Sequence, residues 1–174
     1  SESISMFRGL RETGPAALIP AAWGVTAAAH LDLLTTRPVF VMHGVMCVLL
    51  VAFAAASWRE MTDGVLRTWR NVIVAGTPAA FAGLAGFVVP TGSAILLAAS
   101  LGGWMLLPAA GFVLTARVVQ AGAWIYRSGA ALCLLGAALY AFGATAGPTA
   151  LSIAGLAAVA VGQTAGILDA VLRY

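Results

Sequence analysis

The chain has 174 residues, of which 61% are hydrophobic and 9% charged, whereas an ordinary soluble domain carries about 25% charged residues. So few polar side chains cannot cover a water-exposed surface, and the lipid bilayer is the expected solvent. The net charge of +3 comes from arginines at the ends of apolar runs, which is typical of a topology signal and not of a nucleic-acid-binding surface. The composition predicts an all-α, polytopic integral membrane helical bundle.

The apolar runs can be placed in chain order, since about 20 apolar residues are needed to cross a bilayer. Residues 1–13 are expected to form an interfacial N-terminal segment, and 14–174 a single transmembrane domain. Within that domain we expect six transmembrane helices, at 14–34, 38–58, 71–89, 92–115, 128–146 and 149–171. The stretches 59–70 and 117–127 between them are expected to be short interfacial segments.

The arginines are distributed unevenly over the ends of these spans. Eight of the nine fall on one side of the predicted topology, and Arg37 alone falls on the other. Because cytoplasmic loops carry the excess of basic residues, this predicts a multi-pass cell-membrane protein with both termini in the cytoplasm.

The odd-numbered spans begin near residues 14, 71 and 128, at equal intervals. This spacing indicates three repeated hairpins or, since the sequence is rich in alanine, a chance echo. Small residues four apart, such as Gly162 with Gly166, fit packing within the chain as well as oligomer formation. Pro20, Pro78 and Pro108 lie within spans, and a membrane helix tolerates proline when its neighbours re-satisfy the freed carbonyl, so kinks are expected at these points and not breaks.

Two histidines, His30 and His43, lie on the two arms of the first hairpin. At 1.5 Å per residue, both are expected roughly 10 Å below the turn, near the outer face of the membrane. Imidazole binds transition metals and haem iron, and Met46 adds a soft sulfur ligand beside His43. Adjacent helices lie roughly 8–10 Å apart, so the pair could share one small metal ion but not serve as both axial ligands of one haem. A structural role for both histidines stays open.

The remaining polar residues of the spans have simpler expected roles. Gln163 is expected to form a hydrogen bond between helices. Asp169 is expected to pair with Arg173 on the surface one turn away, and Asp32 with Arg37 at the first outer turn. Since no phosphate loop, Ser-His-Asp set or paired carboxylates occur, the chain is not expected to be an enzyme on its own.

Residues 37–46, with the sequence RPVFVMHGVM, resemble one helix of the catalytic subunit of haem-copper oxidases and nitric oxide reductases. The resemblance implies that His43 would be a ligand of a low-spin haem b. Those subunits carry several further metal-binding histidines, whereas this chain has only His30 besides, so it implies a relative without the oxygen-reducing site. The spacing of His30 and His43 across a hairpin is also similar to the copper-binding hairpin of membrane-bound methane and ammonia monooxygenases, with Thr26 where that family has an aspartate.

These patterns lead to two functional hypotheses. In the first, a small membrane protein binds haem or copper near the outer face through His43 and Met46, or through His30 and His43, as a redox subunit or sensor in a larger assembly. In the second, it is a non-enzymatic membrane module, either a substrate-binding subunit of a transporter or a structural partner subunit. Both imply contact with the lipid bilayer and with further copies of the chain or other membrane subunits.

Overall fold

In the computed structural model, the backbone is described for residues 2–173, and burial and side-chain contacts for residues 14 and 16–173. These residues form six helices joined by short loops. The helices are α1 (Glu2–His30), α2 (Thr36–Ser57), α3 (Gly64–Gly86), α4 (Ser93–Val118), α5 (Ala123–Thr145) and α6 (Thr149–Arg173). The prediction of an all-α helical bundle is therefore confirmed.

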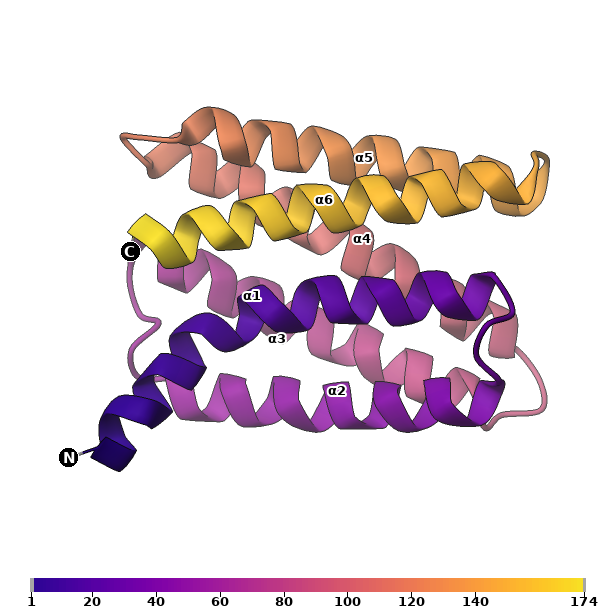
Figure 1. Cartoon of the computed structure of the whole chain (residues 1–174), viewed down its shortest axis with the longest axis horizontal. Coiled ribbons are helices and arrows are strands. Elements are labelled where there is room, and N and C mark those ends of the chain that lie inside the picture. The colour runs from indigo at the N-terminus through magenta and orange to yellow at the C-terminus, as the bar shows by residue number, and fades with distance from the viewer. Residues whose placement is uncertain (1, 174) are drawn as a thin grey trace.

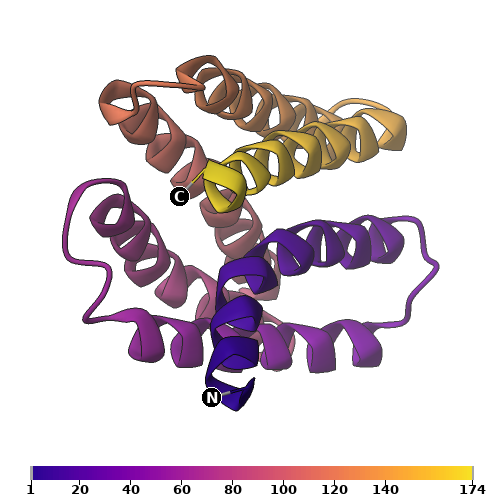
Figure 2. The same cartoon turned by 60° about the vertical axis from the view of Figure 1, so that its left-hand side comes forward.

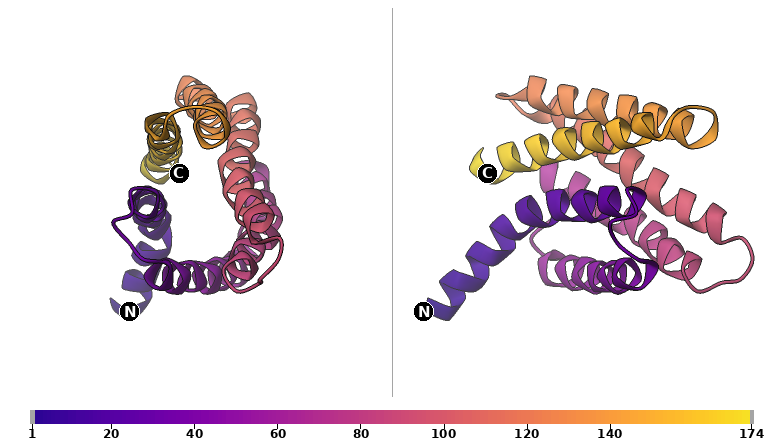
Figure 3. Two further views of the ribbon diagram at one scale, coloured as in Figure 1. Left: turned by 90° about the vertical axis from the view of Figure 1, so that its right-hand side faces the viewer. Right: turned by 45° about the vertical axis from the view of Figure 1, so that its right-hand side comes forward.

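The helices form a ring in chain order that closes through α1 and α6. Both termini and the loops after α2 and α4 lie at one end, and the other three loops lie at the opposite end (Figure 1). Viewed end-on, α1 returns to the side of α6 (Figure 3), and these two helices are in contact. The helices α5 and α6 lie side by side on one flank of the molecule, and α2 lies on the opposite flank (Figure 2).

Four of the helices, α2, α4, α5 and α6, are long and apolar enough to cross a membrane, and the apolar part of α1, Ala16–His30, is shorter. The end of the bundle with both termini and the loops after α2 and α4 carries most of the arginines and is called the basic end here. The helix α3 runs from this basic end to the opposite end, where α4 begins, so it must traverse any layer that α2 and α4 cross. The three-dimensional arrangement therefore fits six crossings, although α3 is not among the helices whose length and hydropathy alone indicate a span.

The segments between the spans differ from the sequence prediction. Residues 2–13 continue α1 as one helix; that they lie at the membrane interface stays a prediction. Most of 59–70 and 117–127 is not a separate segment, because α3 begins at Gly64 and α5 at Ala123. A helix that has been nucleated gains one hydrogen bond per added residue, so it extends through the arginines until a breaker such as Gly122, with φ 73°, ends the run.

Glycines let the backbones of α5 and α6 touch. A Cβ built on Gly136 would lie 2.6 Å from the carbonyl oxygen of Gly155, and one on Gly162 would lie 2.8 Å from that of Gly129. Between α3 and α4 a glycine faces a small side chain instead, and a Cβ on Gly103 would lie 2.9 Å from the Cβ of Ala79. Small residues allow such close approach in membrane bundles, and here they serve packing within the chain.

The three predicted hairpins are present in the topology but are not packed alike. The helices α3 and α4 pack closely, as do α5 and α6, whereas α1 and α2 touch only marginally. The helix α2 has a single glycine, Gly44, and otherwise presents mostly branched or long apolar side chains, so it cannot approach α1 as α5 approaches α6. It is attached to the bundle mainly through α3.

We expect Gly136→Ala to lower the free energy of unfolding by about 1–3 kcal/mol, because the added methyl would meet a backbone oxygen of α6 that cannot move aside alone. Thermal unfolding of the detergent-solubilised protein, followed by circular dichroism, measures the loss.

The matched control is Gly24→Ala, which adds the same methyl to α1 at a position with no atom within 4 Å. Its stability should stay unchanged or rise by up to about 1 kcal/mol, because alanine is the better helix former. Equal losses in the two variants would contradict the packing argument.

Candidate functional site

The buried amide of Gln163 on α6 connects several helices inside the bundle. Its Oε1 accepts a hydrogen bond from the indole Nε1 of Trp23 on α1 over 2.9 Å. Its Nε2 donates to the backbone carbonyl of Trp104 on α4 over 2.8 Å. The predicted inter-helix role of Gln163 is confirmed, and it extends to two neighbouring helices.

The carbonyl of Trp104 is available to Gln163 for a covalent reason. An α-helical carbonyl normally accepts from the N–H four residues later, and here that residue is Pro108, which has no N–H. The amide of Gln163 supplies the missing donor, as expected for a proline inside a membrane helix.

His30 is fully occupied by two protein partners at the end of α1. Its Nδ1 lies 2.8 Å from the carbonyl oxygen of Thr26, and because a carbonyl can only accept, Nδ1 carries the proton. Its Nε2 is then the acceptor for the hydroxyl of Tyr140 on α5, 2.7 Å away. The ring of Tyr140 also meets the imidazole edge-on at 5.4 Å. His30 therefore links α1 to α5 and has no lone pair to spare.

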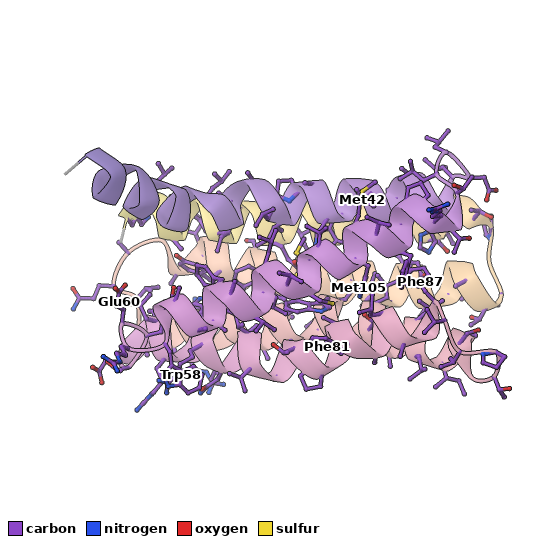
Figure 4. All side chains as sticks on the ribbon, turned by 90° about the horizontal axis from the view of Figure 1, so that it is seen from below. Met42, Trp58, Glu60, Phe81, Phe87 and Met105 are labelled. Atoms are coloured by element: carbon purple, nitrogen blue, oxygen red, sulfur yellow. The ribbon has the colours of Figure 1, made fainter. Side chains whose placement is uncertain are left out.

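His43 ties α2 to α3. Its Nε2 donates to the carbonyl of Ala80 over 2.7 Å, which fixes the tautomer and leaves Nδ1 with the lone pair. The ring enters a notch that only glycine permits, since a Cβ on Gly83 would lie 2.8 Å from Nε2 and closer still to Oγ of Ser100 on α4. Phe87 meets the imidazole edge-on at 5.7 Å and lies toward the end of the bundle opposite Trp58 (Figure 4).

The structure does not bring the two histidines onto a common ligand. The Nε2 of His30 points to α5 and that of His43 to α3. Among the described residues, no group of three or more His, Cys, Asp or Glu side chains could hold a metal ion. One imidazole nitrogen, Nδ1 of His43, has no hydrogen-bond partner among them.

Sulfur-containing side chains follow His43 along the same helix. Met46 and Cys47 lie three and four residues later, so they flank the imidazole on neighbouring positions of the α2 surface. Met46 is half-buried and Cys47 is buried. A shallow groove of about 380 Å³ between α2 and α3 begins at this place, and its lining is apolar apart from the thiol: Gly44, Cys47, Val48, Val51, Ala52, Phe81 and Leu84.

The charged residues near the helix ends differ in part from the prediction. Arg173 Nε pairs with Asp169 Oδ1 at 2.5 Å, as expected, but Asp169 is buried and lies against Gly122 at the start of α5. The pair thus has an exposed guanidinium and a buried carboxylate, and the carboxylate also lies against α5. Asp32 and Arg37 form no ion pair with a described residue. The first outer turn depends instead on Asp32 in a left-handed conformation, with φ 56°.

Comparison with known proteins adds no assignment. No family model, no curated protein and no solved structure matches this chain.

Several residues of the site were missed because their partners lie far away in the sequence. Tyr140 and Ala80 give no local signal that they face a histidine. Gly83 gives a partial signal, since a glycine in mid-helix often marks a close approach. Pro108 and Gln163 could have been paired from the sequence, because the proline leaves a helix carbonyl without its donor and the side-chain amide of Gln163 needs an acceptor.

We expect Gln163→Leu to destabilise the protein by about 1–2 kcal/mol, because the Trp104 carbonyl and the Trp23 indole both lose their partner. The loss should be smaller in a Pro108→Ala background, where the restored backbone N–H at position 108 can satisfy the carbonyl. Thermal unfolding of the four proteins of this double-mutant cycle measures the coupling, and additive losses would contradict the assignment.

Proposed function

We propose that this chain is an integral membrane protein that binds a soft metal ion, copper in its Cu(I) state, through Nδ1 of His43 on α2. It would serve as a redox subunit or sensor within a larger membrane assembly. The observation that carries the proposal is the open Nδ1 of His43, next to two sulfur-containing side chains.

The hydrogen bond of His43 supports this role. Metal-binding histidines usually donate their other ring N–H to a carbonyl or carboxylate, which fixes the tautomer and raises the basicity of the ligating nitrogen. The bond from Nε2 to Ala80 has this form. The same bond also holds α2 on α3, so the two roles are compatible.

The donor set favours copper over haem. Thioether and thiolate sulfur select Cu(I), and Met46 and Cys47 offer both within about one turn of His43. A haem would have to approach Nδ1, the ring nitrogen next to the α2 backbone, where a macrocycle has little room. His30 cannot be the second ligand without giving up Thr26 or Tyr140. We therefore place His43, Met46 and Cys47, and not His30, at the ion.

The test is a Cu(I) titration of the detergent-purified protein in competition with a chromophoric chelator, together with metal analysis and a visible spectrum. We expect one copper per chain, an affinity at least about tenfold lower in His43→Ala, and an unchanged affinity in His30→Ala.

Because His43→Ala also removes a helix contact, Met46→Leu is the second variant, since it keeps shape and apolarity while it removes the sulfur. It should weaken copper binding without changing the unfolding temperature. Equal copper affinity in wild type, His43→Ala and Met46→Leu would overturn the copper site. A Soret band in the spectrum of the wild type that is absent from that of His43→Ala would show that the ligand is haem and not copper.

A second candidate is the non-enzymatic module, and one observation favours it. The helix α2 is the most apolar of the four long apolar helices and the least buried, and it packs mainly on α3. A partner subunit, or a second copy of the chain, would cover this helix. Metal-free protein that retains a stoichiometric partner after detergent extraction would support this candidate over the first.

The arginine distribution further supports the proposal that the basic end faces the cytoplasm in the cell membrane. Single cysteines in the exposed loops, Thr62→Cys at the basic end and Thr91→Cys at the other, test it in a background where Cys47 and Cys133 are replaced. A membrane-impermeant maleimide should label position 91 in intact cells, and position 62 after lysis alone. The reverse pattern would invert the topology.

A further inference from the structure

The basic end of the bundle has arginines without acidic partners. Of the arginines whose side chains are described there, Arg173 pairs with Asp169. Four others are exposed, and their side chains form no hydrogen bond or ion pair with a described residue; they are Arg59, Arg67, Arg117 and Arg127. Exposed guanidinium groups at the end of an apolar bundle are available to an anionic ligand.

Three of these arginines are adjacent in the sequence to a large exposed apolar residue. Arg67 follows Leu66, Arg117 precedes Val118, and Arg59 follows Trp58. These apolar neighbours are 50%, 60% and 48% exposed. A molecule that satisfies both members of such a pair must carry a negative charge next to a hydrocarbon chain.

The exposed arginines and their apolar neighbours form a rim around the basic end, and aromatic residues indicate that this rim lies at the depth of lipid headgroups. The guanidinium of Arg70 stacks over the exposed indole of Trp58, with 4.7 Å between Cζ and the ring centroid. Trp124, beside the start of α5, is also exposed. Tryptophan gathers at the membrane interface because one part of it is apolar and the other polar.

We propose that this rim binds anionic phospholipids, with arginine guanidinium groups on the phosphates and with Leu66, Val118 and Trp58 against the first methylenes of the acyl chains. Arginine suits phosphate because its planar fork donates two parallel hydrogen bonds. A soluble anion or a nucleic acid would satisfy the arginines and leave the apolar neighbours uncovered. The rim goes beyond the copper site, because His43, Met46 and Cys47 lie within α2, whereas the rim lies at and beyond the end of that helix.

The test is native mass spectrometry of the purified protein titrated with phosphatidylglycerol or with phosphatidylcholine of the same acyl chains. Wild type should bind the anionic lipid more tightly. The double variant Arg67→Gln, Arg117→Gln should lose about fivefold in affinity for each arginine removed, or about 25-fold. Both side chains are exposed, so the fold should persist, and size-exclusion chromatography checks this.

Arg37→Gln is the matched control, because Arg37 is exposed at the opposite end of the bundle. It should keep the wild-type preference. Equal binding of the two lipids by wild type, or an unchanged preference in the double variant, would overturn the proposal. Competition by inorganic phosphate at the concentration of the lipid would also overturn it, in favour of a soluble-anion site.

Discussion

The side-chain amide of Gln163 is the interaction on which the ring of helices depends. It faces a carbonyl of α4 that Pro108 has deprived of its helical donor, and it accepts the indole N–H of Trp23 on α1. Inside a bilayer neither group can turn to water, so the unmet hydrogen bond would cost more than it does at a soluble surface. Because α1 packs closely on α6 and hardly on α2, the contact between Trp23 and Gln163 closes the ring where chain connectivity does not.

Glycine determines which helices are rigidly joined and which are not. Backbones touch between α5 and α6, because residues such as Gly136 leave no side chain between them, and Gly103 lets α4 pack directly on the Cβ of Ala79 in α3. The helix α2 lacks such a surface and is held by a polar side chain, His43, inserted into the notch at Gly83. The bundle thus consists of two closely packed hairpins, a first helix fastened through Gln163, and one helix with most of its surface open.

Much of the fold could be predicted from the sequence, because hydropathy reports helices and arginine reports which ends lie together. The role of Gln163 was predictable as well, since a lone buried amide in a span has to bond to another helix. The hydrogen-bond partners of the two histidines could not be predicted from the sequence. Position along a helix gives the depth of His30 and His43, but equal depth does not fix the direction in which each ring points about its own helix axis. Those directions depend on Tyr140 and Ala80, which are 110 and 37 positions away in the chain.

The hydrogen bond between His43 and Ala80 connects the packing of α2 with its proposed chemistry. While Nε2 donates to the carbonyl, Nδ1 must carry the lone pair, so the bond that places the helix also prepares the ligand. An ion on Nδ1 would strengthen the donor character of Nε2 and hold α2 more firmly against α3. Occupancy of the site and the position of the least buried helix would therefore be linked through one imidazole ring, and α2 is the helix that a partner subunit would meet first.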